Sequence, residues 1–173
     1  MLQLILGGAR SGKSRLAEQI AQEIQKPVTY VATAQAFDEE MHDRIQHHQQ
    51  QRPNEWALLE EPLFLADALQ KIDQENHVIL VDCLTLWVSN LLMNENKAMQ
   101  KNEFEKLFKV LTQLKSDVIL VSNETGLGVV PMGQISRKFV DESGRLHQQL
   151  GQFADRVTFC VAGFPMILKG EKA

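Results

Sequence analysis

Residues 2–14 constrain the chain most, because a short apolar run passes directly into a glycine-rich loop. The run from Leu2 to Leu6 has the length and composition of a buried strand. The next eight residues, Gly-Gly-Ala-Arg-Ser-Gly-Lys-Ser, fit the pattern G-x-x-x-x-G-K-[ST] of phosphate-binding loops. Helical periodicity over residues 15–21 completes the strand–loop–helix context that this pattern requires. We predict a nucleotide-binding loop, and the alternative is a glycine-rich turn without a ligand.

Each part of this loop has a physical role. Gly7 and Gly12 allow backbone angles that a side chain would forbid, so loop N–H groups can point at phosphate oxygens. The helix that begins near Lys13 adds the positive end of its dipole. We expect Lys13 to reach the β- and γ-phosphates and the Ser14 hydroxyl to bind Mg²⁺.

Length and composition indicate one ordinary domain over residues 1–173, and the phosphate-loop pattern makes it a predicted nucleotide-binding domain. The net charge of −4 argues against non-specific binding of nucleic acid. Cys83 and Cys160 have no metal-type or redox-type spacing, so we expect buried free thiols in a reducing compartment. The run before Gly7 is too short for a signal peptide, and no stretch approaches about 20 apolar residues. We therefore expect a cytoplasmic protein with no membrane span and no nucleic-acid partner.

Strand-like and helix-like segments alternate along the rest of the chain. This alternation predicts right-handed crossovers and an α/β fold, a mainly parallel sheet with helices on both faces. Ligands bind at the carboxyl ends of such strands, so we expect the site along one edge of the sheet. The expected strands cover residues 2–6, 28–33, 77–82, 117–122, 156–163 and 164–168, and the expected helices cover 13–25, 38–51, 63–72, 84–93, 104–114 and 134–154.

Asp82 follows four apolar residues at the end of a predicted strand. A carboxylate in this position is typical of the magnesium side of phosphate-loop enzymes. The pattern is common, so the alternative is that Asp82 caps the helix that begins at Leu84. We predict that Asp82 binds Mg²⁺ or its water shell together with Ser14.

The segment 40–52 is rich in histidine, glutamine and arginine. On a helix, Arg44, His48 and Arg52 are spaced i, i+4, i+8 and share one face. Two flanking guanidiniums favour a neutral imidazole, which is the form that a nucleophile needs. The alternative is a solvated polar helix with incidental histidines. His47 points about 100° away and lies four residues after Asp43, which favours an exposed, ion-paired side chain.

Taken together, several segments make the chain resemble a known enzyme family over residues 2–163, nearly its whole length. Beyond the loop of residues 7–14, these segments are Tyr30-Val31-Ala32-Thr33-Ala34, Glu40-Met41, Arg44-Ile45, His48, Arg52-Pro53, Trp56, Glu60, Asp82-Cys83-Leu84-Thr85 and Asn123-Glu124-Thr125-Gly126-Leu127-Gly128-Val129-Val130-Pro131. The family is the bifunctional adenosylcobinamide kinase/adenosylcobinamide-phosphate guanylyltransferase of cobalamin synthesis.

The resemblance implies two reactions and a RecA-like P-loop NTPase fold. A nucleoside triphosphate, ATP or GTP, would phosphorylate the aminopropanol hydroxyl of adenosylcobinamide. GTP would then guanylylate that phosphate through a guanylyl-histidine, giving adenosylcobinamide-GDP. The partners implied are the small-molecule corinoid and the nucleotides, and the assembly implied is a homotrimer.

The resemblance also implies roles for individual residues. His48 matches the family's nucleophile, although the neighbouring His47 leaves a one-residue ambiguity, and Lys13 is the second catalytic residue. The nucleotide-binding positions implied are Gly7, Gly8, Ala9, Arg10, Ser11, Gly12, Lys13, Ser14, Ala32, Thr33, Ala34, Gln49, Gln50, Gln51, Arg52, Glu60 and Asp82.

One departure concerns the long helix near the C-terminus. Where family members often have Gly-Arg-x-Asn-Gln, this chain has His147 in place of the asparagine. If that asparagine touches substrate, His147 alters the corinoid contact or replaces it with a similar polar one.

Two other functions remain open on the residues alone. A single-function kinase for another small alcohol would not need His48. A nucleotide-dependent switch or assembly ATPase would hydrolyse nucleotide in response to a macromolecular partner and would form no covalent nucleotide.

Overall fold

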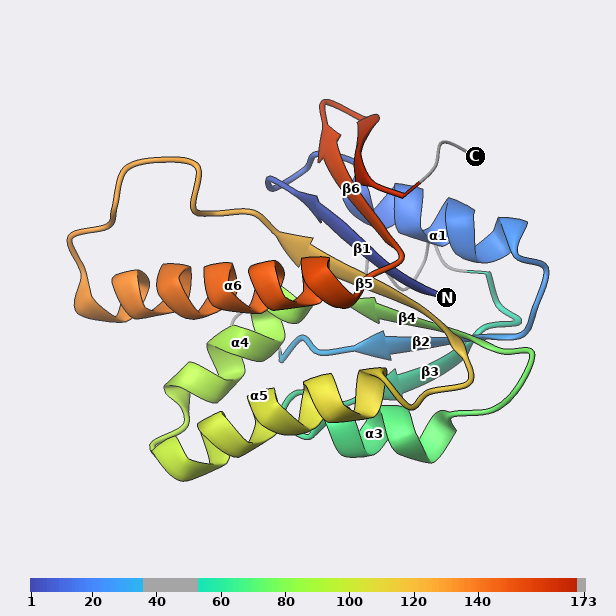
Figure 1. Cartoon of the computed structure of the whole chain (residues 1–173), viewed down its shortest axis with the longest axis horizontal. Coiled ribbons are helices and arrows are strands. Elements are labelled where there is room, and N and C mark those ends of the chain that lie inside the picture. The colour runs from blue at the N-terminus through green and yellow to red at the C-terminus, as the bar shows by residue number, and fades with distance from the viewer. Residues whose placement is uncertain (36–52, 171–173) are drawn as a thin grey trace.

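A computed structural model shows a seven-stranded sheet with helices on both faces (Figure 1). The structure describes residues 1–35 and 53–170. The predicted helix over 38–51 lies outside the described residues. The strands are β1 Leu2–Gly7, β2 Val28–Ala32, β3 Ala57–Glu60, β4 Val78–Asp82, β5 Asp117–Asn123, β6 Arg156–Val161 and β7 Phe164–Lys169.

The strand order is β3-β2-β4-β5-β1-β6-β7. All neighbouring strands pair in parallel except β6 and β7, which form an antiparallel hairpin at one end of the sheet. The carboxyl ends of β1 to β6 therefore share one edge of the sheet, called here the carboxyl edge. The mainly parallel α/β fold predicted from the sequence is confirmed.

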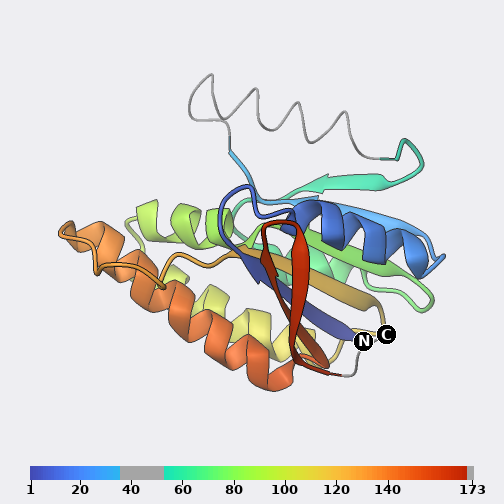
Figure 2. The ribbon, with the colours of Figure 1, turned by 90° about the horizontal axis from the view of Figure 1, so that it is seen from above.

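Helices cover the two faces of the sheet unequally. Figure 2 shows α1 on one face, with α4, α5 and α6 on the other. The buried contacts agree, because α1 shares one core cluster with the sheet and the remaining helices share the other. The helices are α1 Lys13–Glu23, α3 Leu65–Ile72, α4 Leu84–Met93, α5 Lys97–Leu111 and α6 Gln134–Phe153.

The two core clusters follow from alternation along buried strands. In β1, Leu4 and Leu6 face the larger cluster, while Ile5 faces the smaller one beside α1. Ala17 and Ala21 line the buried side of α1, so this helix lies close against the sheet. The close packing fixes the start of α1 relative to the end of β1, and that junction is the predicted phosphate loop.

Most predicted elements are present, with three differences. A strand at Ala57–Glu60 was not predicted, and it pairs with β2 as the edge of the sheet. Helix α5 begins at Lys97, seven residues before the predicted start, because Asn96 caps it by accepting a 3.0 Å bond from the Met99 N–H. The strand expected to run to Gly163 ends at Val161, and Ala162 and Gly163 form the tight turn into β7.

Candidate functional site

The phosphate loop joins β1 to α1 and needs glycine at both ends of its turn. A Cβ at Gly7 would lie 2.5 Å from Ser11 Oγ and 2.6 Å from the Cys160 carbonyl oxygen. Gly12 has φ of +91° and precedes the first helical residue. A side chain at either position would displace the loop backbone. The two glycines of the pattern therefore stand where sterics require them.

Lys13 lies in the first turn of α1 and is 8% exposed. Its Nζ donates a 3.2 Å hydrogen bond to the Gly8 carbonyl oxygen, so the ammonium lies across the loop. A positive charge held over loop N–H groups at a helix N-terminus is an anion-binding arrangement. The predicted contact of Lys13 with phosphate is compatible with this position.

The turn between β6 and β7 supports the phosphate loop from the side. The Gly163 N–H donates a 2.8 Å bond to the Ser11 carbonyl oxygen, and Cys160 Sγ donates to the same oxygen at 3.0 Å. Ala162 and Gly163 have φ of +51° and +84°, typical of a two-residue hairpin turn. Sequence reasoning missed this support, because it places Ala162 and Gly163 at the end of the preceding strand.

The carboxyl end of β5 is bonded to the phosphate loop and to α4. The Glu124 N–H donates a 3.0 Å bond to the Gly7 carbonyl oxygen. The Asn123 N–H donates a 2.6 Å bond to Thr85 Oγ1, at the start of α4. Residues 123 and 124 therefore lie beside the phosphate loop at the carboxyl edge, where the sequence predicts the site.

His147 of α6 lies inside the molecule, 8% exposed. Its Nε2 is 2.8 Å from Ser122 Oγ, and its Nδ1 is 3.6 Å from Glu124 Oε2 without a hydrogen-bond partner. Burial lowers the pKa of His147, and the Glu124 carboxylate opposes that shift. The residue therefore orients the end of β5 in this structure and offers little surface for a direct substrate contact.

Asp82 ends β4 beside a buried polar bridge. Thr33 Oγ1 donates to the Cys83 carbonyl oxygen at 2.7 Å and accepts from the Cys83 N–H at 3.1 Å. The N-cap of α4 is Cys83, with no side-chain cap, so Asp82 does not have the capping role considered as the alternative. Thr33 is fully buried, so its hydroxyl supports the edge rather than facing a ligand.

Both cysteines are free and buried, as predicted. Burial, with a smaller contribution from the Asp82 charge, raises the pKa of the Cys83 thiol to about 11. A thiol with this pKa stays protonated at neutral pH and is a poor nucleophile. Cys83 therefore does not compete with histidine for a role in covalent catalysis.

The strand order spreads the predicted nucleotide residues along the carboxyl edge. Neighbouring strands lie about 4.8 Å apart, so β4 with Asp82 is about 10 Å from β1 and β3 with Glu60 is about 19 Å from it. Ala32, at the end of β2, lies between Asp82 and Glu60 and pairs with both residues. The predicted nucleotide-binding residues in the described chain thus extend along this edge from β1 to β3, the outermost strand on that side.

Several predicted site residues lie outside the described residues. They include the proposed nucleophile and its neighbours, and all come from one segment of the sequence: Arg44, His47, His48, Gln49, Gln50, Gln51 and Arg52.

The donors predicted for Mg²⁺ are uncommitted in the described parts of the chain. Within residues 1–35 and 53–170, neither the Asp82 carboxylate nor the Ser14 hydroxyl makes a hydrogen bond or ion pair. The same residues contain no cluster of three or more histidine, cysteine or acidic side chains suited to a metal. Mg²⁺ commonly takes only one or two protein ligands and completes its shell with phosphate oxygens and water, so this donor set fits the ion.

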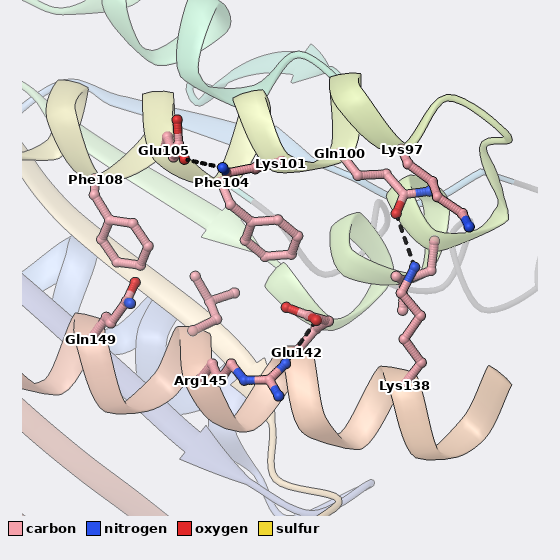
Figure 3. A pocket seen from close by; sticks show the side chains of 12 residues that line it. Lys97, Gln100, Lys101, Phe104, Glu105, Phe108, Lys138, Glu142, Arg145 and Gln149 are labelled. Atoms are coloured by element: carbon pink, nitrogen blue, oxygen red, sulfur yellow. Dashed lines mark hydrogen bonds and ion pairs between the residues drawn. The ribbon is translucent and has the colours of Figure 1, made fainter. Parts of the chain in front are cut away.

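A cavity of about 360 Å³ lies between α5 and α6, away from the predicted site (Figure 3). Phe104 and Phe108 form part of its apolar wall. Its charged side chains are largely paired, with Arg145 Nη1 2.8 Å from Glu142 Oε1 and Lys101 Nζ 3.7 Å from Glu105 Oε1. None of its lining residues is among the predicted nucleotide-binding positions.

Comparison with known families identifies the chain. The family model described as cobinamide kinase / cobinamide phosphate guanyltransferase matches residues 3–168. The chain belongs to this family. The kinase and guanylyltransferase activities expected from the resemblance are confirmed at the level of the family.

Curated relatives agree over almost the full length. The bifunctional adenosylcobalamin biosynthesis protein CobP of Pseudomonas aeruginosa is 55% identical, with 99% of each chain covered. The bifunctional adenosylcobalamin biosynthesis protein CobU of Escherichia coli is 36% identical, covering 98% of this chain and 100% of the relative. The CobU of Salmonella typhimurium is 37% identical with the same coverage.

Solved structures share the fold at low identity. A Pyrococcus horikoshii OT3 protein has a TM-score of 0.58 at 10% identity and covers 99% of this chain and 87% of its own. A RadB recombinase has a TM-score of 0.51 at 19% identity, covering 91% and 73%. The predicted RecA-like P-loop class is confirmed as a fold.

Proposed function

We propose that this single domain performs both family reactions at one nucleotide site on the carboxyl edge. In the first, the aminopropanol hydroxyl oxygen of adenosylcobinamide attacks the γ-phosphorus of ATP or GTP, and the nucleoside diphosphate leaves. In the second, GMP from GTP is transferred to the new phosphate, and pyrophosphate leaves. The braced phosphate loop with Lys13 lying across it is the observation that supports this proposal most.

The nucleotide would lie along the carboxyl edge with its phosphates on residues 7–14. The N–H groups of the loop and the Lys13 ammonium would neutralise charge that builds up during both transfers. The position of Glu60, about 19 Å across the sheet from β1, supports a role toward the base rather than the phosphates. Its carboxylate can accept hydrogen bonds from the N–H groups that distinguish guanine. Residues 32–34 would line the edge between them.

Mg²⁺ would be held by Ser14 and Asp82, both hard oxygen donors without other partners in the described chain. When bound, the ion neutralises phosphate charge. The protein's own part is to position the two oxygens at the ends of β4 and the phosphate loop.

His48 would be the nucleophile of the guanylyl transfer. Direct attack of one phosphate dianion on another is opposed by charge, and a histidine intermediate divides the transfer into two displacements. The His48 ring nitrogen would form a bond to the α-phosphorus as pyrophosphate leaves, and the acceptor phosphate oxygen would then displace the histidine. The flanking arginines of the sequence pattern, Arg44 and Arg52, support a neutral imidazole and phosphate binding.

Assembly and location are also proposals. We expect a homotrimer that works in the cytoplasm on small-molecule substrates, as the family resemblance implies. In the described residues, no helix is both long and apolar enough to cross a bilayer.

Mass spectrometry of the corinoid tests the proposal as a whole. Incubation with Mg²⁺, ATP and adenosylcobinamide should give the phosphorylated corinoid, and later addition of GTP should give adenosylcobinamide-GDP. The same reaction with GTP alone shows which nucleotide the kinase prefers. Phosphorylation without any GDP adduct would leave a single-function kinase, and absence of both products would overturn the proposal.

A further inference from the structure

We propose that the apolar segment Leu127–Met132, with the groove beside it, receives the corrin macrocycle of the acceptor substrate. This inference rests on the proposed function, because it names the part of that substrate which the segment holds. The segment, called here the apolar loop, connects β5 to α6 and begins at the carboxyl edge. Figure 1 shows it extending beyond the end of the sheet.

The apolar loop exposes large hydrophobic side chains in close succession. Leu127 is 80% exposed, while Val129 and Met132 are each 95% exposed. Soluble domains rarely leave contiguous apolar surface without a binding role. The segment has no charged residue, so its recognition must depend on apolar contact rather than on ion pairs.

The backbone of the apolar loop is held at both ends. The Glu124 carboxylate accepts a hydrogen bond from the Gly126 N–H. Arg137 Nη1 donates to the Pro131 carbonyl oxygen at 3.2 Å and to the Met132 carbonyl oxygen. The exposed side chains are therefore presented on a supported backbone, which reduces the ordering cost when a ligand binds.

A groove of about 360 Å³ continues the apolar surface between α4 and α6. Its walls include Met93, Pro131, Ile135, Phe139 and Val140. Three residues with hydroxyl groups, Ser89, Thr125 and Ser136, also line it. A mainly apolar surface with a few hydrogen-bonding groups suits a corrin, whose ring is apolar and whose edge bears amide side chains.

The position of the apolar loop relative to the phosphate loop favours the corrin macrocycle as its ligand. The Glu124 N–H is bonded to the Gly7 carbonyl oxygen at 3.0 Å, so the connection that leads into the apolar loop starts beside the phosphate loop. In the acceptor, the reacting hydroxyl lies at the tip of one side chain of the macrocycle. When that hydroxyl reaches the nucleotide, the macrocycle must rest on a neighbouring surface, and the apolar loop and groove provide one.

The test compares the kinetics of one double substitution in the apolar loop with those of a single control substitution elsewhere. In Val129→Ser/Met132→Ser, we expect the KM for adenosylcobinamide in the kinase reaction to rise about tenfold or more, with a smaller change in kcat, because apolar contact area is lost. The matched control is Leu168→Ser, which removes a 58% exposed apolar side chain from β7. It should leave the KM for adenosylcobinamide unchanged.

A small acceptor separates macrocycle binding from chemistry. N-acetyl-1-amino-2-propanol carries the reacting hydroxyl without the macrocycle, so the loop variant and the parent should phosphorylate it with equal kcat/KM. An unchanged KM for adenosylcobinamide, or an equal loss with the small acceptor, would overturn the inference.

Two further readouts distinguish the remaining outcomes. If the loop variant changes its oligomeric state in light scattering, the face is an interface between copies of the chain and the inference is wrong. Guanylyl-enzyme formation from GTP needs no acceptor, so it tests the proposed function separately. If the parent protein forms no guanylyl-enzyme, guanylyl transfer is contradicted. The KM for adenosylcobinamide in the kinase reaction still tests the role of the apolar loop.

Discussion

The Glu124 N–H donates a 3.0 Å hydrogen bond to the carbonyl oxygen of Gly7, although the two residues are far apart in the sequence. Gly7 begins the phosphate loop, and Glu124 begins the connection that leads to the apolar loop and α6. One backbone hydrogen bond thus joins the nucleotide side of the carboxyl edge to the proposed acceptor side. Phosphate donor and hydroxyl acceptor would meet at this junction.

The two adjacent glycines of the phosphate loop should respond differently to alanine. Gly7→Ala places a Cβ within 2.6 Å of the Cys160 carbonyl oxygen. We therefore expect the free energy of unfolding to fall by about 1–3 kcal/mol and the Tm to fall by several degrees. Gly8→Ala is the control, because an added Cβ meets nothing within 4 Å. Thermal unfolding gives the Tm of both variants. Equal Tm values would show that the close contact at Gly7 does not restrict which residue fits there.

Lys13→Met should remove both activities while keeping the fold. The substitution retains the buried stem of the side chain and deletes the ammonium that lies across the loop. We expect the kinase rate and the rate of guanylyl-enzyme formation each to fall about 100-fold or more. Lys101→Met, at an 80% exposed side chain, is the control and should keep both rates. Retention of either rate in Lys13→Met would contradict a shared nucleotide site.

Asp82→Asn tests the metal assignment. The amide keeps the size of the side chain but loses the charge that would hold Mg²⁺ at the end of β4. We expect half-saturation by Mg²⁺ in the kinase reaction to require about tenfold more metal or more. Asp67→Asn removes an exposed carboxylate paired with Lys106 and should show no such change. An unaltered Mg²⁺ dependence in Asp82→Asn would exclude Asp82 from the metal site.

His147 should make the protein less stable in mild acid. Its folded-state pKa lies below the ordinary value of 6.5 because of burial, so the unfolded chain takes up the proton first as the pH falls. The free energy of unfolding therefore decreases as the pH drops below about 6.5. Burial lowers the pKa of His77 as well, which adds to the effect, whereas burial raises the pKa of Glu103, which opposes it.

His147→Asn isolates the contribution of this residue. The asparagine keeps a polar group near Ser122 but does not titrate, so the loss of stability between about pH 7.5 and about pH 5.5 should be smaller than in the parent. Denaturant titrations at both pH values provide the comparison. Equal losses in the two proteins would show that His147 does not titrate with folding.

The phosphate loop and the parallel sheet were predictable because each depends on local sequence. Leu2 to Leu6 form an uninterrupted buried strand, and Gly7 and Gly12 are required by close contacts and a positive φ. The Thr33–Cys83 bridge beside Asp82 was not predictable, because it joins residues that are 50 apart in the sequence.

Elements stabilised by their partners were missed or misplaced. Strand β3, Ala57–Glu60, is short, mostly exposed and without alternation, so only its pairing with β2 defines it. The first turns of α5 are polar, with Gln100 and Glu103 buried by tertiary contacts that hydrophobic periodicity does not register. The turn at Ala162–Gly163 was hidden because the apolar residues on both sides extended the apparent strand.

The central claim, a guanylyl-histidine at His48, is tested most directly by labelling. The protein is incubated with Mg²⁺ and GTP labelled on the α-phosphate, denatured, and examined for acid-labile, base-stable label, with γ-labelled GTP and the variants His48→Ala and His47→Ala in parallel. We predict label from the α position only, lost in His48→Ala and kept in His47→Ala. Absence of covalent label in the parent protein, or label that survives His48→Ala, would contradict the account.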